Sequence, residues 1–296
     1  MNIAELLKKF NENVNAADFA LCLAGLILFG YWLLITSLGR KALADSLPRR
    51  NDMPIHVVFI PLFIWFLAVP LAIMASTEML PELTVWESAL VNNAFFCIGG
   101  IIAMIVIIHI VRVHFVRKLD GFGLNFKTLH RDFPAAVVNL LTAWPLITVM
   151  FVLTIRLGEL TVGPDFKMPE HESLEQLTKY PQLPLKIMII CSAVIVAPLF
   201  EEMLFRGLIQ TMLRGFISRL PVCQDLSNES IKPWLAIVIT SAMFAVIHAS
   251  PAHWPALFML SVCLGYSYEK SGSLLRPIFI HLLFNSASVI AALYSG

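Results

Sequence analysis

Charged residues are scarce in this sequence. Of its 296 residues, 14% are Asp, Glu, Lys or Arg, 58% are hydrophobic, and the mean hydropathy is +0.79. Soluble domains carry about a quarter charged and about half apolar residues, so this composition indicates a chain that folds in lipid. The formal net charge of +1 gives no support for a nucleic-acid partner, and none is expected.

Paired cysteines, repeats and a cleavable leader are also missing. The five cysteines stand singly, mostly inside apolar runs, so neither a disulfide framework nor a thiolate metal site is indicated, and small core residues are predicted. No internal repeat or low-complexity stretch is visible. The first apolar run has no basic residues directly before it and no small-residue cleavage site after it, so we expect a retained helix. The cysteines are Cys22, Cys97, Cys191, Cys223 and Cys263.

What the sequence does contain is long apolar runs. A membrane-spanning helix needs about 20 mostly apolar residues, and eight runs approach or reach that length. The fold class predicted is therefore an all-α polytopic membrane bundle of about eight transmembrane helices, with seven as the alternative because the sixth and seventh runs are short. The runs are Phe19 to Leu38, Ile55 to Met74, Val91 to Val111, Pro134 to Leu153, Leu185 to about Phe205, Trp234 to His248, Ala256 to Tyr268 and Leu275 to Tyr294.

The distribution of basic residues predicts the orientation. Most of the 21 Lys and Arg residues fall in the connections after the first, third, fifth and seventh runs, whereas the connections after the second and fourth are acidic or mainly acidic. Because cytoplasmic loops are enriched in Lys and Arg, both termini are predicted to lie outside the cytoplasm, with Lys8 and Lys9 as exceptions to the trend. We expect an integral protein of a bacterial plasma membrane.

Ionisable residues inside membrane helices are costly and mark functional sites by default. At the inner end of the fifth run stands Glu201-Glu202-x-x-x-Arg206. Residues four apart share a helix face, so Glu202 and Arg206 are predicted to form an ion pair, leaving Glu201 directed elsewhere. A charge cluster at the headgroup level is the alternative interpretation.

Two further polar groups follow on later runs. Phe244-x-x-x-His248 ends the sixth run, and His281-x-x-x-Asn285 lies inside the eighth, with its two polar residues one turn apart. Each alone is compatible with a structural role, since His and Asn also hydrogen-bond neighbouring membrane helices. Their combination with the glutamate pair within one short region favours a reaction site.

These three motifs, in this order, resemble the CPBP family of intramembrane proteases, the CAAX-protease and bacteriocin-processing (Abi) group to which the Rce1 prenyl-protein endopeptidases belong. The resemblance covers roughly residues 185–290. Ala197-Pro198 before the glutamates and Ser271-Gly272-Ser273-Leu274 before His281 also fit the family pattern. The division expected is 1–160 as helices of unassigned role, 161–183 as an acidic non-cytoplasmic connection, and 184–296 as the protease domain.

The resemblance implies hydrolysis of a peptide bond in a membrane-associated protein or peptide. The substrate would be of CAAX type, with or without a prenyl group, or of leader or bacteriocin type. Glu201 would activate water with help from His248, and His281 and Asn285 would stabilise the oxyanion. Glu202 and Arg206 would hold their helix in place, with Phe244 as a further supporting residue. General chemistry agrees, since a buried carboxylate suits a base, and His and Asn can donate to a developing negative charge.

Metal dependence is the open alternative. Glu201, His248 and His281 would make a two-histidine, one-carboxylate set suited to catalytic zinc. The sequence lacks a His-Glu-x-x-His helix, and a glutamate mechanism uses the same residues and also gives Asn285 a role. We therefore favour the mechanism without metal, with no cofactor certain and zinc retained as the alternative.

Two other classes of function compete with the protease. Intramembrane Glu and His also mark the ion pathways of proton-coupled transporters, but the polar groups lie in one half of the chain, without a matching half-repeat. A silent membrane scaffold with the same fold is the second alternative. Membrane lipid is an expected partner in every case.

Overall fold

The computed structural model describes residues 16–80, 82–220 and 231–295. Within these ranges the chain is helical, and its one β feature is an isolated bridge between Asn51 and Phe115. Lys8, Lys9 and Cys223 lie outside the described residues. The predicted all-α membrane bundle is confirmed.

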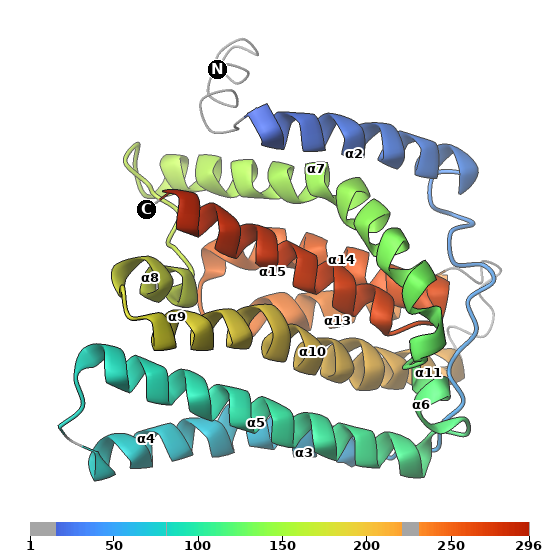
Figure 1. The fold of residues 1–296 in the computed structure, drawn as a ribbon. Coiled ribbons are helices and arrows are strands. Elements are labelled where there is room, and N and C mark those ends of the chain that lie inside the picture. The colour runs from blue at the N-terminus through green and yellow to red at the C-terminus, as the bar shows by residue number, and fades with distance from the viewer. Residues whose placement is uncertain (1–15, 81, 221–230, 296) are drawn as a thin grey trace.

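Eight helical stretches run between the two ends of the bundle in the described chain (Figure 1). Successive stretches alternate in direction, so the start of α2 and the end of α15 lie at the same end. The stretches are α2 (Ala16–Ile35); η1 (Ile55–Val58), α3 (Phe59–Phe63), η2 (Ile64–Ala68) and α4 (Val69–Met79); α5 (Val85–His114); α7 (Leu129–Thr161); α9 (Leu183–Ile190), η4 (Cys191–Val196), α10 (Ala197–Glu202), η5 (Met203–Gln210) and α11 (Thr211–Arg219); α13 (Ile231–Val246); α14 (Trp254–Ser271); and α15 (Leu275–Ser295).

Five of these stretches are long and apolar enough to cross a membrane by length and composition, and α2 and α13 are shorter apolar helices. Short elements occupy the connections. They are α6 (Lys118–Phe122), η3 (Phe126–Thr128), α8 (Glu172–Lys179) and η6 (Pro251–His253). The acidic surface helix α8 lies within the predicted acidic connection, and its buried Leu177 packs into a cluster with residues of α5, α9 and α15.

Helix ends differ from the predicted runs for local reasons. The fourth stretch begins at Leu129 and contains both Pro134 and Pro145; α7 bends along its length (Figure 1), as expected where proline removes a helical hydrogen bond. The fifth stretch continues to Arg219, past the charges where the apolar run ends. Polar residues therefore do not stop a helix whose buried face has partners.

Proline also explains two π-helical stretches. Proline has no N–H and its ring clashes with the carbonyl four residues earlier, so the preceding turn widens. Pro70 follows η2 and Pro198 follows η4 in this way. The third π stretch, η5, has no proline after it; there Gly207 lies so close to the Phe122 ring that an added Cβ would be 2.1 Å from its Cζ.

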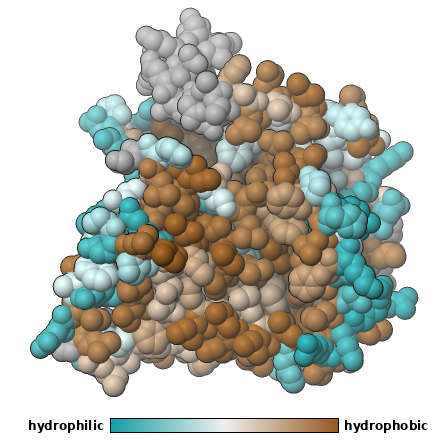
Figure 2. Space-filling model, viewed as in Figure 1, coloured by the Kyte–Doolittle hydropathy of each residue, from teal (hydrophilic) through white to brown (hydrophobic). Residues whose placement is uncertain are grey.

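The outside of the bundle is apolar. Figure 2 shows hydrophobic residues across the middle of one face and hydrophilic residues gathered toward its sides. Large side chains such as Ile27, Leu34 and Ile105 are more than half exposed. A soluble protein rarely exposes so continuous an apolar surface, and lipid is the solvent that suits it.

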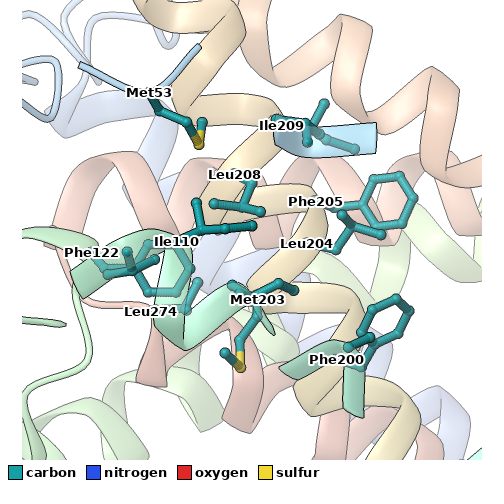
Figure 3. Packing of buried hydrophobic residues seen from close by; sticks show 14 of the residues in the cluster. Met53, Ile110, Phe122, Phe200, Met203, Leu204, Phe205, Leu208, Ile209 and Leu274 are labelled. Carbon is teal, nitrogen blue, oxygen red and sulfur yellow. The ribbon is translucent and has the colours of Figure 1, made fainter. Parts of the chain in front are cut away.

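The largest buried cluster surrounds η5. Met203, Leu204, Phe205, Leu208 and Ile209 pack there against residues from α5, α6, α13, α14 and α15 (Figure 3). A second cluster joins α7 to α14 and α15. The helix that carries the glutamate pair is thus enclosed by the rest of the bundle.

Candidate active site

The two adjacent glutamates lie in α10, the short α-helical stretch between the π stretches η4 and η5. π-helical turns occur often at functional sites because they re-aim side chains relative to a regular helix. Adjacent residues of α10 point about 100° apart, so the two carboxylates meet different surroundings.

Glu202 is the carboxylate enclosed by protein. Its Oε1 accepts hydrogen bonds from Arg206 Nη1 at 2.8 Å and from His281 Nδ1 at 2.8 Å, and both Glu202 and Arg206 are 0% exposed. The predicted Glu202–Arg206 ion pair is therefore present. Arg206 Nη2 also donates to Ser261 Oγ at 2.6 Å, which links α14 to the pair.

The contact with Glu202 assigns the two nitrogens of His281. An ionised carboxylate only accepts hydrogen bonds, and Arg206 balances its charge, so Nδ1 of His281 is the donor. Nε2 is then the nitrogen directed at Glu201, whose Oε2 is 3.8 Å away. Glu202 thus orients His281, beyond the helix-holding role implied by the family resemblance.

Glu201 is the carboxylate that protein does not fully enclose. Its side chain is 16% exposed, against 0% for Glu202. The pair therefore divides into one carboxylate committed to Arg206 and His281 and one that is partly exposed beside His281 Nε2. Only the second is open to a molecule from outside the protein.

His248 lies one aromatic ring away from these groups. The helix α13 ends at Val246, so His248 stands in the following turn, where its Nδ1 is 2.7 Å from the Phe244 carbonyl. The buried Phe244 ring is 4.9 Å from the His248 ring and 5.9 Å from the His281 ring, centroid to centroid, and Arg206 Cζ lies 4.8 Å from its centroid. Both imidazole rings therefore lie near the Phe244 ring, and the structure gives no hydrogen bond or ion pair between His248 and Glu201.

Asn285 lies one turn after His281 on α15, as the spacing predicts. Its Nδ2 donates to the Ala193 carbonyl in η4 at 2.7 Å. The widened π turn presents this carbonyl to the side of the helix. In this arrangement Asn285 joins α15 to η4, and one N–H of its amide is already occupied.

The residues that would hold a metal do not form a binding site as they are placed. Among the residues that the structure describes, no group of three His, Cys, Asp or Glu side chains could hold a metal ion. Two of the three proposed ligands, His248 and His281, each lie near the Phe244 ring, at centroid distances of 4.9 and 5.9 Å. No step of the chemistry below is routed through a metal.

Sequence reasoning missed the residues that fix the start of α15. Asp132 in α7 is fully buried, accepts from Ser273 Oγ at 2.6 Å, and accepts from Arg276 Nε and Nη2 at 3.2 and 3.0 Å. A lone carboxylate at the entry of an apolar run was the available signal. Ser261, the partner of Arg206, had no signal beyond its place in an apolar helix.

Comparison with known proteins gives one family match. Residues 183–287 match the family model described as type II CAAX prenyl endopeptidase Rce1-like. The chain is also 25% identical over 194 residues to an uncharacterized 24.3 kDa protein of Escherichia coli. The aligned residues make up 64% of this chain and 77% of that protein. No solved structure matches the chain. The matched segment contains every motif residue discussed above.

Proposed function

Because residues 183–287 belong to the Rce1-like family of CAAX endopeptidases, we propose that this integral membrane protease hydrolyses its peptide bond with Glu201 as the general base. The observation that carries the proposal is the difference between the two adjacent glutamates. Glu202 is fully buried and bonded to Arg206 and His281, whereas Glu201 is partly exposed beside His281 Nε2.

The reaction begins with water at Glu201. The carboxylate accepts a proton while the water oxygen attacks the peptide carbonyl, and the protonated Glu201 then donates to the leaving amine, so no proton is gained or lost overall. A low-dielectric site strengthens each of these hydrogen bonds. We propose that His248 assists by orienting the water, which requires its ring to move toward Glu201 when substrate binds.

The oxyanion would be stabilised by His281 and Asn285. His281 can donate from Nε2 while Nδ1 donates to Glu202 only when both nitrogens carry a proton. Because Arg206 already balances Glu202, the charge on His281 is balanced by Glu201 and, once Glu201 has taken the proton from water, by the oxyanion itself. Asn285 keeps one amide hydrogen beyond its bond to Ala193. Losing one donor of this kind raises a barrier by about 3 kcal/mol.

The substrate we propose is a peptide segment of a membrane-associated protein, either a prenylated CAAX-type terminus or a leader- or bacteriocin-type peptide. The exposed apolar belt of the bundle allows such a segment to arrive from lipid. We further propose that the bundle end bearing the basic connections faces the cytoplasm, which places both termini outside it.

The decisive experiment is cleavage of a membrane-peptide library by the purified protein in lipid nanodiscs, with and without a chelator. Glu201→Ala and His248→Ala should each abolish cleavage, and Glu78→Gln, which changes an exposed carboxylate, should cleave like wild type. Chelator-resistant cleavage supports the glutamate mechanism. Stoichiometric zinc with chelator-sensitive cleavage would replace it with a metalloprotease, and full activity of Glu201→Ala would refute the assignment of the base.

A further inference from the structure

Beyond the candidate site, polar residues continue along the same face of the long helix. Glu202, Arg206 and Gln210 follow at four-residue spacing, and all three are fully buried. Four-residue spacing also separates their partners on α14. We call these six residues the polar seam: Glu202, Arg206 and Gln210 with Ser261, Gly265 and Glu269.

The seam is hydrogen-bonded at both of its ends. At the candidate site, Arg206 bonds Glu202 and Ser261. At the other end, Gln210 Nε2 donates to the Gly265 carbonyl at 3.2 Å and to Glu269 Oε1 at 3.1 Å. Between Arg206 and Gln210 the side chains are not joined.

The hydrogen bonds of the seam are interrupted between Arg206 and Gln210, and one donor atom and one acceptor atom lie there without a partner. Arg206 Nε, a donor, and Gln210 Oε1, an acceptor, are buried and bond no group in the described part of the chain. Leaving such atoms unpaired in a buried place costs about 1–3 kcal/mol each. Arg206 and Gln210 stand one turn apart on one helix face, so their side chains are neighbours. A single water that accepts from one atom and donates to the other can join two atoms that do not bond directly.

Gly265 gives the Gln210 side chain room to lie against α14. A Cβ at this position would lie 2.7 Å from Gln210 Oε1 and 3.1 Å from Ile237 Cγ2. The glycine has an ordinary helical backbone, so its role here is to leave space on α14 opposite the unpaired oxygen.

Beyond Glu269 the chain of bonds leaves the family-matched segment. Ser46, which is partly exposed, donates to Glu269 Oε2 at 2.7 Å. Ser46 belongs to the connection between α2 and η1, residues 36–54, which buries Ala42 and Leu43 against Ile237 and stacks Arg49 on the Tyr268 ring. This connection is therefore fixed to the end of the seam.

We propose that one buried water bridges Arg206 Nε and Gln210 Oε1 beside Gly265. The completed chain runs from Ser46 through Glu269, Gln210, the water, Arg206 and Glu202 to His281, and it makes Gln210, Glu269 and Ser46 positioning residues of the candidate site. The water site stands on geometry alone, whereas its consequence for catalysis rests on the proposed function.

A pair of glycine variants tests the proposal in the intact protein. Gly265→Ala places a methyl group 2.7 Å from Gln210 Oε1, so this oxygen must move and lose the bridge, while every hydrogen-bonding group is kept. Gly215→Ala adds the same methyl group where nothing lies within 4 Å. Gly265→Ala should lower kcat about tenfold with KM within about twofold, the size of loss typical when the support of an active-site group is disturbed. Gly215→Ala should match wild type.

Two readouts do not depend on cleavage. An experimental structure that resolves ordered water should show density between the two atoms in wild type and none in Gly265→Ala. Ring 15N spectra should show a changed His281 signal in Gly265→Ala and an unchanged one in Gly215→Ala. If Gly265→Ala does not fold, Gln210→Met is measured in its place.

Each outcome decides something. Direct contact of Arg206 with Gln210, or no water in wild type, refutes the water site. A water that is present while Gly265→Ala leaves His281 and kcat unchanged refutes the positioning role. A water and a shifted His281 signal in a protein that cleaves nothing would uphold the seam and refute the protease.

Discussion

The two regions of the bundle are held together differently. In the first four helical stretches, residues 16–161, helices approach closely where a glycine leaves room. The last four stretches, residues 183–295, are also joined by buried hydrogen bonds between charged and polar side chains. Gly25 meets the Leu141 carbonyl and Gly99 meets Val69, each within 2.2 Å of an added Cβ. The second region buries Glu202, Arg206 and Glu269. Since lipid gives apolar helices no hydrophobic reason to associate, close packing serves the first region, and costly polar contacts are concentrated near the candidate site.

Asp132 is one of the residues that join the two regions. Asp132, in the first region, is fully buried and bonds Ser273 and Arg276 at the start of the helix that carries His281. The first region therefore contributes to the site by fixing α15. The predicted boundary near residue 160 separates two kinds of packing, and a hydrogen-bonded network joins the two regions.

The largest effect expected is from breaking the buried ion pair. Arg206→Met leaves Glu202 buried without its cation and should lower the free energy of unfolding by about 3–5 kcal/mol. The matched variant in the first region is Arg156→Met, whose pair with Glu159 is partly exposed at 12% and 25%, and it should cost about 1 kcal/mol or less. Unfolding followed by circular dichroism in one detergent compares them, and equal losses would contradict the contrast between the regions.

Sequence reasoning predicted the fold well because apolar runs report directly on lipid. It also predicted the Glu202–Arg206 pair, since four-residue spacing fixes a shared face. It did not predict that His281 bonds Glu202, because the contact joins helices that lie 79 residues apart in sequence. The π turns around α10 shift the side-chain directions that regular helix geometry would give, and α13 ends at Val246, two residues before the predicted helix end at His248.

A somewhat smaller loss is expected at the contact between the two regions. Asp132→Asn keeps the shape of the side chain but removes the charge that pairs with Arg276, and it should cost about 2–3 kcal/mol. Because α15 would lose part of its anchor, cleavage should fall as well. Asp120→Asn, in the connecting helix α6, is the control. An Asp132→Asn protein with unchanged stability would show that α15 is held by apolar packing alone.

Packing in the first region is tested within a single helix. Gly25 of α2 faces the Leu141 carbonyl, and an added Cβ would lie 2.2 Å from that oxygen. This carbonyl accepts no helical hydrogen bond from Pro145, because proline has no N–H. Gly25→Ala must push α2 away from α7 and should cost about 1–3 kcal/mol. Gly30→Ala, where nothing lies within 4 Å, should be neutral or stabilising by up to about 1 kcal/mol. The prediction fails if the two variants unfold alike, and neither should change the substrate cleaved.

The smallest effect concerns pH and the second region's outer connection. Burial of the His253 ring lowers the pKa of His253 from its ordinary value and is the largest effect on it. A hydrogen bond with the Pro169 backbone raises this pKa by less, and the charge of the nearby His248 lowers it further. The unfolded chain therefore binds a proton at this site at a higher pH than the folded protein does. Stability from this group is complete above the unfolded pKa of about 6.5 and is lost as the pH falls through the lower folded value. In His253→Gln the melting temperature should fall less between neutral and acidic pH than in wild type. An equal or steeper fall would show that His253 is not responsible. The control is His56→Gln, far from this connection, in which the melting temperature should fall with pH as it does in wild type.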